Sequence, residues 1–188
     1  MSAPYFVQTL ASQKAAGTLF NTYTSAKSVI NVTELVPIPG NYMQVGTKFR
    51  IKAWGGLSNI VTTPGTVAFQ VMMGSVVVFT TGNIQMTTTA NTLSPLKFEA
   101  TLRLDSTGSG TAAKFIGEGV LGALNLTIGS GANPTVTDTF AMVPVTAPAV
   151  GTGFDSTVSE ILDFWVGFSI SNAGNGVQIY DYTVEQLN

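Results

Sequence analysis

The sequence contains no cysteine and no histidine, and only 10% of its 188 residues are charged. The lack of cysteine excludes disulfides and thiolate metal sites, so packing or assembly must stabilise the fold. The lack of histidine removes the side chain used most often as a general base and a metal ligand. The chain is also apolar overall, with a mean hydropathy of +0.33. We therefore expect a non-enzymatic, structural protein with no catalytic residues, no cofactor and no metal site.

Other signals are missing as well. The sequence has no Gly-x-Ser-x-Gly motif, no P-loop and no dinucleotide-binding fingerprint. It starts without a basic segment that leads into an apolar one, so we expect no secretory signal. No window of about 20 residues is apolar enough to span a bilayer. A net charge of −2 argues against a dominant basic face. We expect neither a nucleic acid nor a membrane as a partner.

The few charges are distributed unevenly along the chain. Residues 1–114 carry all 8 basic residues and 3 acidic ones, whereas residues 115–188 carry 7 acidic residues and no basic one. Such a chain can meet copies of itself, or a larger partner, through complementary surfaces. The alternative is that the two signs mix on the folded surface and the asymmetry has no role.

Apolar and polar residues alternate over most of the chain after residue 28. The stretches are 30–38, 49–53, 67–73, 98–104 and 162–170, and the clearest is 98–104. This period of two is typical of strands with one buried face. Gly74-Ser75 predicts a hairpin turn between residues 66–73 and 76–80, and residues 105–110, 129–134 and 172–176 predict loops.

About eight to ten short antiparallel strands fit between these turn signals, a density typical of a jelly-roll-type β-sandwich. We therefore predict an all-β fold with a single sandwich domain over residues 26–188. Residues 1–25 have few alternating apolar positions and are predicted to form an N-terminal arm. A short helix from Pro4 to about Gly17 is the alternative for part of this arm.

If the side chains of the last predicted strand, residues 177–187, alternate regularly between its two faces, both faces are apolar. Val177 and Ile179 fall on one face, and Tyr180, Tyr182 and Val184 on the other. A strand of this kind needs neighbours across both faces, which predicts a homo-oligomer. The two tryptophans, Trp54 and Trp165, strengthen that prediction. The alternative is a monomer with a thick core.

Three cations, Lys48, Arg50 and Lys52, lie on one face of a predicted strand, about 6.6–7 Å apart. They are suited to an acidic partner surface, phosphate or a polysaccharide, or they form a solvated outer face. Together with the large aromatic residues they make up the candidate interface, which comprises Lys48, Arg50, Lys52, Trp54, Trp165, Tyr180 and Tyr182.

Acidic residues gather near the end of the sequence, at Asp155, Glu160, Asp163, Asp181 and Glu185. Carboxylates grouped in this way can bind Ca²⁺. No loop among them has the dense alternating oxygen ligands of a dedicated calcium site. We therefore interpret them as surface acids.

Several segments resemble small virion proteins of tailed bacteriophages. These are FRIKAWGG at residues 49–56, VAFQVMMG at 67–74, FDSTV at 154–158 and the terminal TVEQLN at 183–188. The resemblance covers about two thirds of the chain. It implies a jelly roll that assembles as a homotrimer, is made in the host cytoplasm and binds the major capsid protein. Such a decoration or cement protein sits on the outer surface of the capsid and stabilises it. The alternative within the same group is a tail, baseplate or fibre component that binds a host surface glycan through exposed aromatic side chains.

Overall fold

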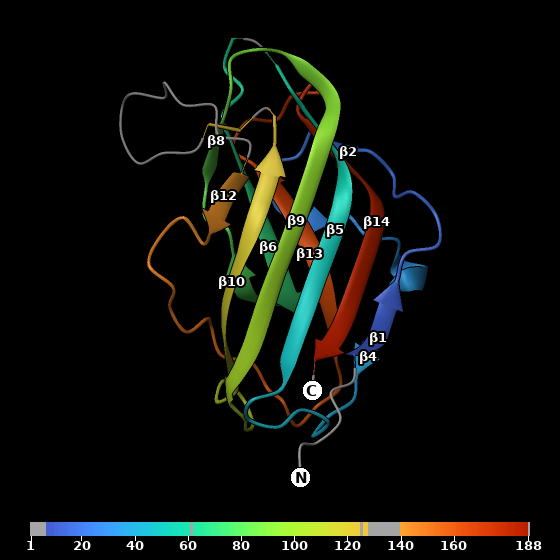
Figure 1. Ribbon diagram of the computed structural model, residues 1–188, viewed down its shortest axis with the longest axis vertical. Helices are drawn as coiled ribbons and strands as arrows, with labels where there is room; N and C mark the ends of the chain where they lie inside the picture. The colour runs from blue at the N-terminus through green and yellow to red at the C-terminus, as the bar shows by residue number, and fades with distance from the viewer. Residues whose placement is uncertain (1–6, 61, 125, 128–139, 188) are drawn as a thin grey trace.

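The computed structural model describes residues 7–60, 62–124, 126–127 and 140–187, which form two antiparallel sheets packed face to face (Figure 1). The first sheet has the spatial order β1 (Val7–Ser12), β14 (Gly176–Leu187), β5 (Lys48–Asn59), β9 (Asn91–Ser106), β10 (Lys114–Ala123) and β12 (Phe140–Val143), and β2 (Phe20–Asn21) also pairs with β14. The second has the order β11 (Leu126–Thr127), β8 (Ile84–Met86), β6 (Thr66–Met73), β13 (Glu160–Phe168) and β3 (Lys27–Ser28), with β4 (Pro37–Ile38) on β13 and β7 (Val76–Thr80) on β6. The predicted all-β sandwich is confirmed.

Two nested strand pairs connect the sheets. β5 pairs with β14 in the first sheet, and β6 pairs with β13 in the second. The connection from β5 to β6 leaves the first sheet for the second, and the connection from β13 to β14 returns to it, as in the wrapped hairpins of a jelly roll. The wrapping places four central strands, two on each sheet, around one core.

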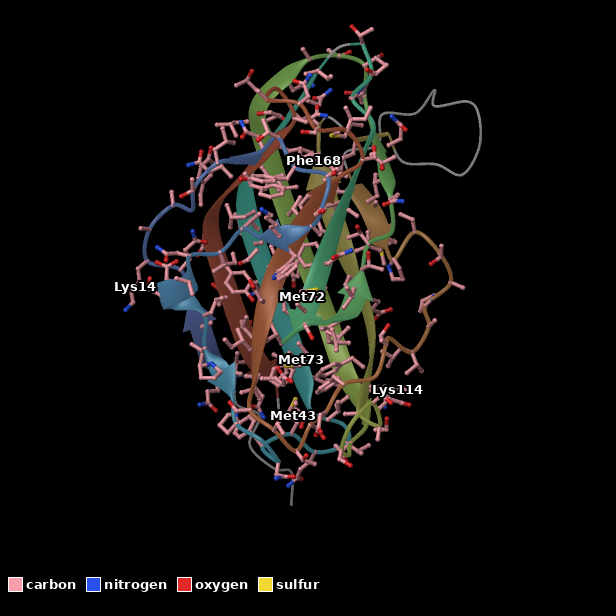
Figure 2. The ribbon with its side chains drawn as sticks, turned by 180° about the vertical axis from the view of Figure 1, so that it is seen from behind. Lys14, Met43, Met72, Met73, Lys114 and Phe168 are labelled. Carbon is pink, nitrogen blue, oxygen red and sulfur yellow. The ribbon has the colours of Figure 1, made fainter. Side chains whose placement is uncertain are left out.

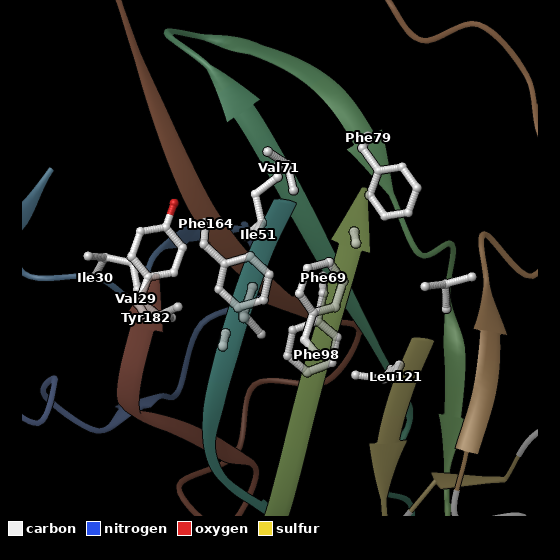
Figure 3. Close-up of a cluster of buried hydrophobic side chains, with 14 of the residues drawn as sticks. Val29, Ile30, Ile51, Phe69, Val71, Phe79, Phe98, Leu121, Phe164 and Tyr182 are labelled. Carbon is white, nitrogen blue, oxygen red and sulfur yellow. The ribbon is translucent and has the colours of Figure 1, made fainter. Parts of the chain in front are cut away.

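Aromatic rings pack against one another in the space between the sheets (Figure 3). Phe98 of β9 lies 4.8 Å from Phe164 of β13, measured between ring centroids, and Phe164 lies 5.8 Å from Phe69 of β6. Each ring of this size removes roughly 150–250 Å² from water, so a few of them dominate the core. The inward residues of β5, β6, β9 and β13 are those that the alternation predicted.

The predicted hairpin is also confirmed. β6 ends at Met73 and β7 begins at Val76, with Gly74 at a φ of +58° between them. Only glycine adopts this left-handed conformation without strain, which is why the turn begins there. The predicted loops at 105–110 and 172–176 fall on the connections 107–113 and 169–175, but Asp105 and Ser106 still belong to β9 and Gly176 begins β14. Residues 129–134 lie outside the described residues.

The strand expected over residues 30–38 is wrong. This segment contains the short 3-10 helix η1 (Val32–Glu34), flanked by β3 and β4 of two residues each. The Asn31 side chain accepts a hydrogen bond from the Thr33 backbone N–H at 3.2 Å, so a local turn competes with a strand ladder. Val32, expected to point inward, is 76% exposed.

The N-terminal segment joins the first sheet, at least from residue 7 onward. β1 pairs with the end of β14, and the Gln13 and Gly17 backbone N–H groups donate to the carbonyls of Tyr182 and Ile179, both at 2.8 Å. A helix up to Gly17 is therefore wrong for residues 7–17, while Pro4 lies outside the described residues. Phe20 is buried in the core, so the segment from 7 to 21 packs on the sandwich.

The last strand is apolar on one face only. A bulge at Tyr180 shifts the register between Ile179 and Asp181, so that Val177, Ile179 and Tyr182 all point into the core. The extra residue changes which side chains face inward beyond it. The two-faced strand that predicted a homo-oligomer is therefore wrong, and self-association needs a different surface.

Candidate interface on the outer face of the first sheet

Residues on the outer face of the first sheet, which faces the viewer in Figure 1, line up in rows across the strands. Strand register places five side chains of one row on β14, β5, β9, β10 and β12 in turn. The first row consists of Asp181, Trp54, Lys97, Gly122 and Phe140. The second row consists of Thr183, Lys52, Glu99, Val120 and Met142. Apart from Trp54, each row is therefore polar on β14, β5 and β9, and it has no polar side chain on β10 and β12.

Val120, Phe140 and Met142 at the apolar ends of these rows, with Leu124 just beyond β10 and Trp54 of β5, make up a cluster that we call the apolar patch. All but the part-buried Val120 are exposed. Trp54 is 51% exposed, Phe140 61% and Met142 70%. Gly122, which has no side chain, lies in the row between Lys97 and Phe140. As a result, a hollow of about 350 Å³ opens between the Trp54 and Phe140 rings. Apolar side chains grouped in this way mark a binding surface more often than scattered ones do.

The β14 side of the same face carries compensated charges. Arg50 Nη2 lies 2.6 Å from Glu185 Oε2, and Lys52 Nζ lies 3.2 Å from the same oxygen. Burial alone would raise the pKa of the Glu185 carboxyl, but hydrogen bonds from Arg50 and Lys52 outweigh it and hold this pKa below its usual range. Two of the three predicted cations therefore bind an acid of the neighbouring strand. The third, Lys48, stands directly opposite Arg103.

A further ion pair lies between the two halves of the face. Lys97 Nζ is 3.7 Å from Glu99 Oε2, two residues along β9, and 5.5 Å from the centre of the Trp54 ring. Both side chains of the pair are about two-fifths exposed, so the pair contributes little to stability in the isolated chain. It nevertheless places a cation, Lys97, at the middle of the first row and an anion, Glu99, at the middle of the second row.

The outer face of the second sheet is closed instead. Asp163 of β13 accepts hydrogen bonds from Trp165 Nε1 at 2.7 Å, Ser28 Oγ at 2.9 Å and the Phe164 backbone N–H at 2.6 Å. Burial raises the pKa of this carboxyl, and the hydrogen bonds offset that effect only in part. Met72 lies opposite Asp163 on β6 and is 3% exposed (Figure 2). The chain thus covers the part of this face around Asp163 and Met72 with its own residues, whereas Ile161, nearer the start of β13, is 41% exposed.

The seven candidate interface residues do not form one surface. Lys48, Arg50, Lys52 and Trp54 share the outer face of the first sheet, as the alternation predicted. Tyr180 is exposed at the bulge, and Trp165 is part-buried on the second sheet. Tyr182 is fully buried, and its hydroxyl has no hydrogen-bond partner among the described residues, so it cannot meet a partner protein directly.

The sequence analysis missed the apolar residues of β10 and β12. Phe140 and Met142 stand in a short run, FAMV, whose alternation is too brief to predict a strand. Their importance comes from strand register, which places them beside Trp54 from a distant part of the chain. A single sequence does not contain that register.

The acidic residues are also distributed over separate places. Asp155 accepts hydrogen bonds from the Thr157 hydroxyl and the Gly110 backbone N–H, which lower the pKa of its carboxyl. It thereby ties two loops together at one end of the sandwich. Within the described ranges, no group of three or more acidic residues is placed to hold a metal ion. No helix there is long and apolar enough to cross a membrane.

Comparison with known proteins adds no relative: no family model, no curated protein and no solved structure matches this chain. The resemblance to phage virion proteins therefore stays a prediction.

Proposed function

We propose that this chain is a virion structural protein of the decoration or cement type, which acts by assembly and not by catalysis. It would be made in the host cytoplasm, associate with itself and bind the major capsid protein on the outer surface of the head. The observation that carries the proposal is the apolar patch, since a sandwich that works alone has no need to expose Trp54, Phe140 and Met142 together.

The size of the patch supports this interpretation. Its four most exposed side chains each leave on the order of 100 Å² outside, which gives about 400 Å² of apolar area. At roughly 25 cal/mol per Å², covering this area contributes about 10 kcal/mol before the costs of association. Exposed ion pairs contribute about 0.2–1 kcal/mol each. Apolar burial is therefore the stronger of the two forces available on this face.

The mechanism that follows is mechanical. A protein that binds only the assembled shell stabilises that shell by mass action, because opening it requires the loss of the bound copies. A rigid sandwich suits the task, since its binding face loses little conformational entropy on docking. In this proposal self-association, which the sequence analysis expected to produce a homotrimer, uses the apolar patch and not β14.

Copy number per particle tests the proposal. In purified virions, quantitative mass spectrometry should find this chain in numbers comparable with the capsid subunits. The double variant Phe140→Ser/Met142→Ser should fold normally and be largely lost from the particles. A few dozen copies per particle would place the protein on the tail, and absence from virions would overturn the proposal.

A second candidate function is favoured by one observation. The half-exposed Trp54 ring borders a hollow that also contains Lys97, and sugars stack on aromatic faces beside polar groups. A tail or fibre protein could bind a host glycan there. Titration with host-surface oligosaccharides, followed by the fluorescence of Trp54 and Trp165 together, tests this candidate, with Trp54→Ala as the variant that should lose the response. The glycan function is excluded if the wild-type protein does not respond.

A further inference from the structure

We propose that the outer face of the first sheet is complementary to itself, and that a second copy of this chain packs on it face to face. The twofold axis would lie in the plane of the interface and run perpendicular to the strands. It would pass midway between the first and the second row. This inference rests on the proposed function only in treating that face as an assembly surface. It names the partner as another copy of the same chain, and the contact closes as a twofold dimer in place of the homotrimer that the sequence analysis expected.

Strand register determines which residues meet. A twofold axis across the strands places each strand over its own copy in the opposite direction, an arrangement compatible with aligned packing of two sheets about 10 Å apart. Each first-row residue then meets the second-row residue of the same strand. On β9, Lys97 meets Glu99 of the second copy, and the symmetry repeats this contact. The two intramolecular pairs merge into a cluster of four alternating charges around the axis.

The other strands are complementary in the same register. On β12, Phe140 meets Met142 of the second copy, a favourable contact between sulfur and an aromatic ring. On β10, Val120 meets the open position at Gly122. On β5 and β14, Trp54 faces a lysine, Lys52, and Asp181 faces a hydroxyl, Thr183. No like charges stand opposite each other in these two rows.

Charge also excludes the competing twofold arrangement. If the axis ran along β9 instead, Lys97 would face Lys97 and Glu99 would face Glu99 of the second copy. Like charges opposed in this way are costly in an interface. Of the two in-plane axes centred on β9, only the one across the strands brings opposite charges together.

The area needed by an interface agrees with this placement. The apolar patch alone, at about 400 Å², is smaller than the roughly 800 Å² per partner of a stable complex. The interface must therefore extend into the adjoining charged positions. Centring it on Lys97 and Glu99 lets it cover both the patch and part of the β14 side of the face.

Charge reversal tests the pairing directly, with oligomeric state measured by sedimentation velocity over a range of concentrations. The wild-type protein should dimerise. In a dimer of the Lys97→Glu variant, two acidic side chains of one copy face two of the other, and in a dimer of Glu99→Lys two lysines face two lysines. Each single variant should therefore raise the dimer dissociation constant by about tenfold or more. An equimolar mixture of the two variants should form heterodimers again, because the two acids of one copy then meet the two lysines of the other. The double variant should dimerise by itself.

The mixture separates contact between copies from the pair within one chain, since neither single variant can restore its own ion pair. Arg103→Glu is the matched control, because Arg103 and Asp105 form an equivalent ion pair on the same strand and face, outside the two rows. It should leave dimerisation unchanged. The proposal is overturned if the wild-type protein is monomeric or if the mixture of the two variants stays monomeric. It is also overturned if the wild type is a trimer and neither charge reversal changes its oligomeric state. None of these results depends on the copy number in virions, so the two proposals can fail separately.

Discussion

The outer faces of the two sheets differ in how the chain completes them. On the second sheet, Trp165 and Ser28 converge on Asp163, and the outward Met72 is almost fully covered. On the first sheet, the outward Met142 and Phe140 remain exposed. The centre of the second face is thus covered by the chain itself, whereas the described residues of the first face leave large apolar side chains exposed. The difference indicates where the protein binds, because a fold that can bury one outer face has no structural need to leave the other open.

The largest expected effect comes from a matched pair of methionines. Met72→Ala should lower the free energy of unfolding by about 2–4 kcal/mol, because it leaves a cavity under the closed face. Met142→Ala removes the same atoms from an exposed position and should change the free energy of unfolding of the monomer by less than about 0.5 kcal/mol. Urea denaturation of both variants, at a concentration below dimerisation, makes the measurement. Equal losses would remove the distinction between the faces.

The next effect concerns the carboxylate of the closed face. Asp163→Ala removes the acceptor of three hydrogen bonds and leaves the Trp165 and Phe164 N–H groups unpaired. An unsatisfied buried donor costs about 1–3 kcal/mol, so we expect a loss of about 2 kcal/mol. Asp181→Ala, on the open face, is the control and should have almost no effect. A larger loss of stability in Asp181→Ala than in Asp163→Ala, measured from denaturation curves, would contradict this comparison.

The sequence predicted the two faces with unequal success. Alternation identified β5 and β9 because their inward residues repeat without interruption, and it therefore placed Lys48, Arg50, Lys52 and Trp54 on one side. It failed at Tyr180, where a single bulged residue reverses the alternation and buries Tyr182. A bulge has no composition signal as clear as the alternation it breaks.

The closed face was less predictable for a different reason. The segment with Ser28 and Asn31 resembles a strand by its hydrophobic pattern, but local hydrogen bonding at Asn31 produces a turn there. The apolar patch depends on contacts between β5, β10 and β12, which are far apart in the sequence. Residue types were therefore enough for the core, whereas the candidate interface required the register.

Acidic groups on the two faces should give opposite pH dependences. The lowered pKa of Glu185 means that its stabilisation is present above the unfolded value of 4.5 and is lost as the pH falls through the folded value. The raised pKa of Asp163 means that its contribution is present below the unfolded value of 3.8 and is lost as the pH rises through the folded value. Relative to wild type, Glu185→Gln should therefore be less stable at pH 7, by about 0.5–1 kcal/mol because its partners are partly exposed, and nearly equal at pH 3.

The matching variant of the closed face is Asp163→Asn. Its stability relative to wild type should rise as the pH increases from about 4 to 7, whatever the constant loss from the altered hydrogen bonds. Thermal or urea unfolding of both variants and the wild type across this pH range gives, for each variant, the slope of its relative stability against pH. Slopes of the same sign would show that the two carboxylates share one environment, and the contrast between the faces would fail.

The smallest expected effect is that of salt on the assembly, and it decides which half of the open face holds it together. The screening length falls from about 10 Å at 0.1 M to about 3 Å at 1 M salt, which weakens exposed ion pairs most. Such pairs contribute about 0.2–1 kcal/mol each, whereas covering the apolar patch contributes about 10 kcal/mol before association costs. The dimer dissociation constant should therefore change by less than about tenfold over this range of salt. The double variant Lys48→Ser/Arg50→Ser, which leaves both rows intact, should slow association more than it speeds dissociation, because charges at the margin of an interface act mainly on encounter. Sedimentation and stopped-flow measurements at both salt concentrations test this ranking. If the dimer dissociates fully at 1 M salt, the charged half of the face, and not the patch around Phe140 and Met142, holds the copies together.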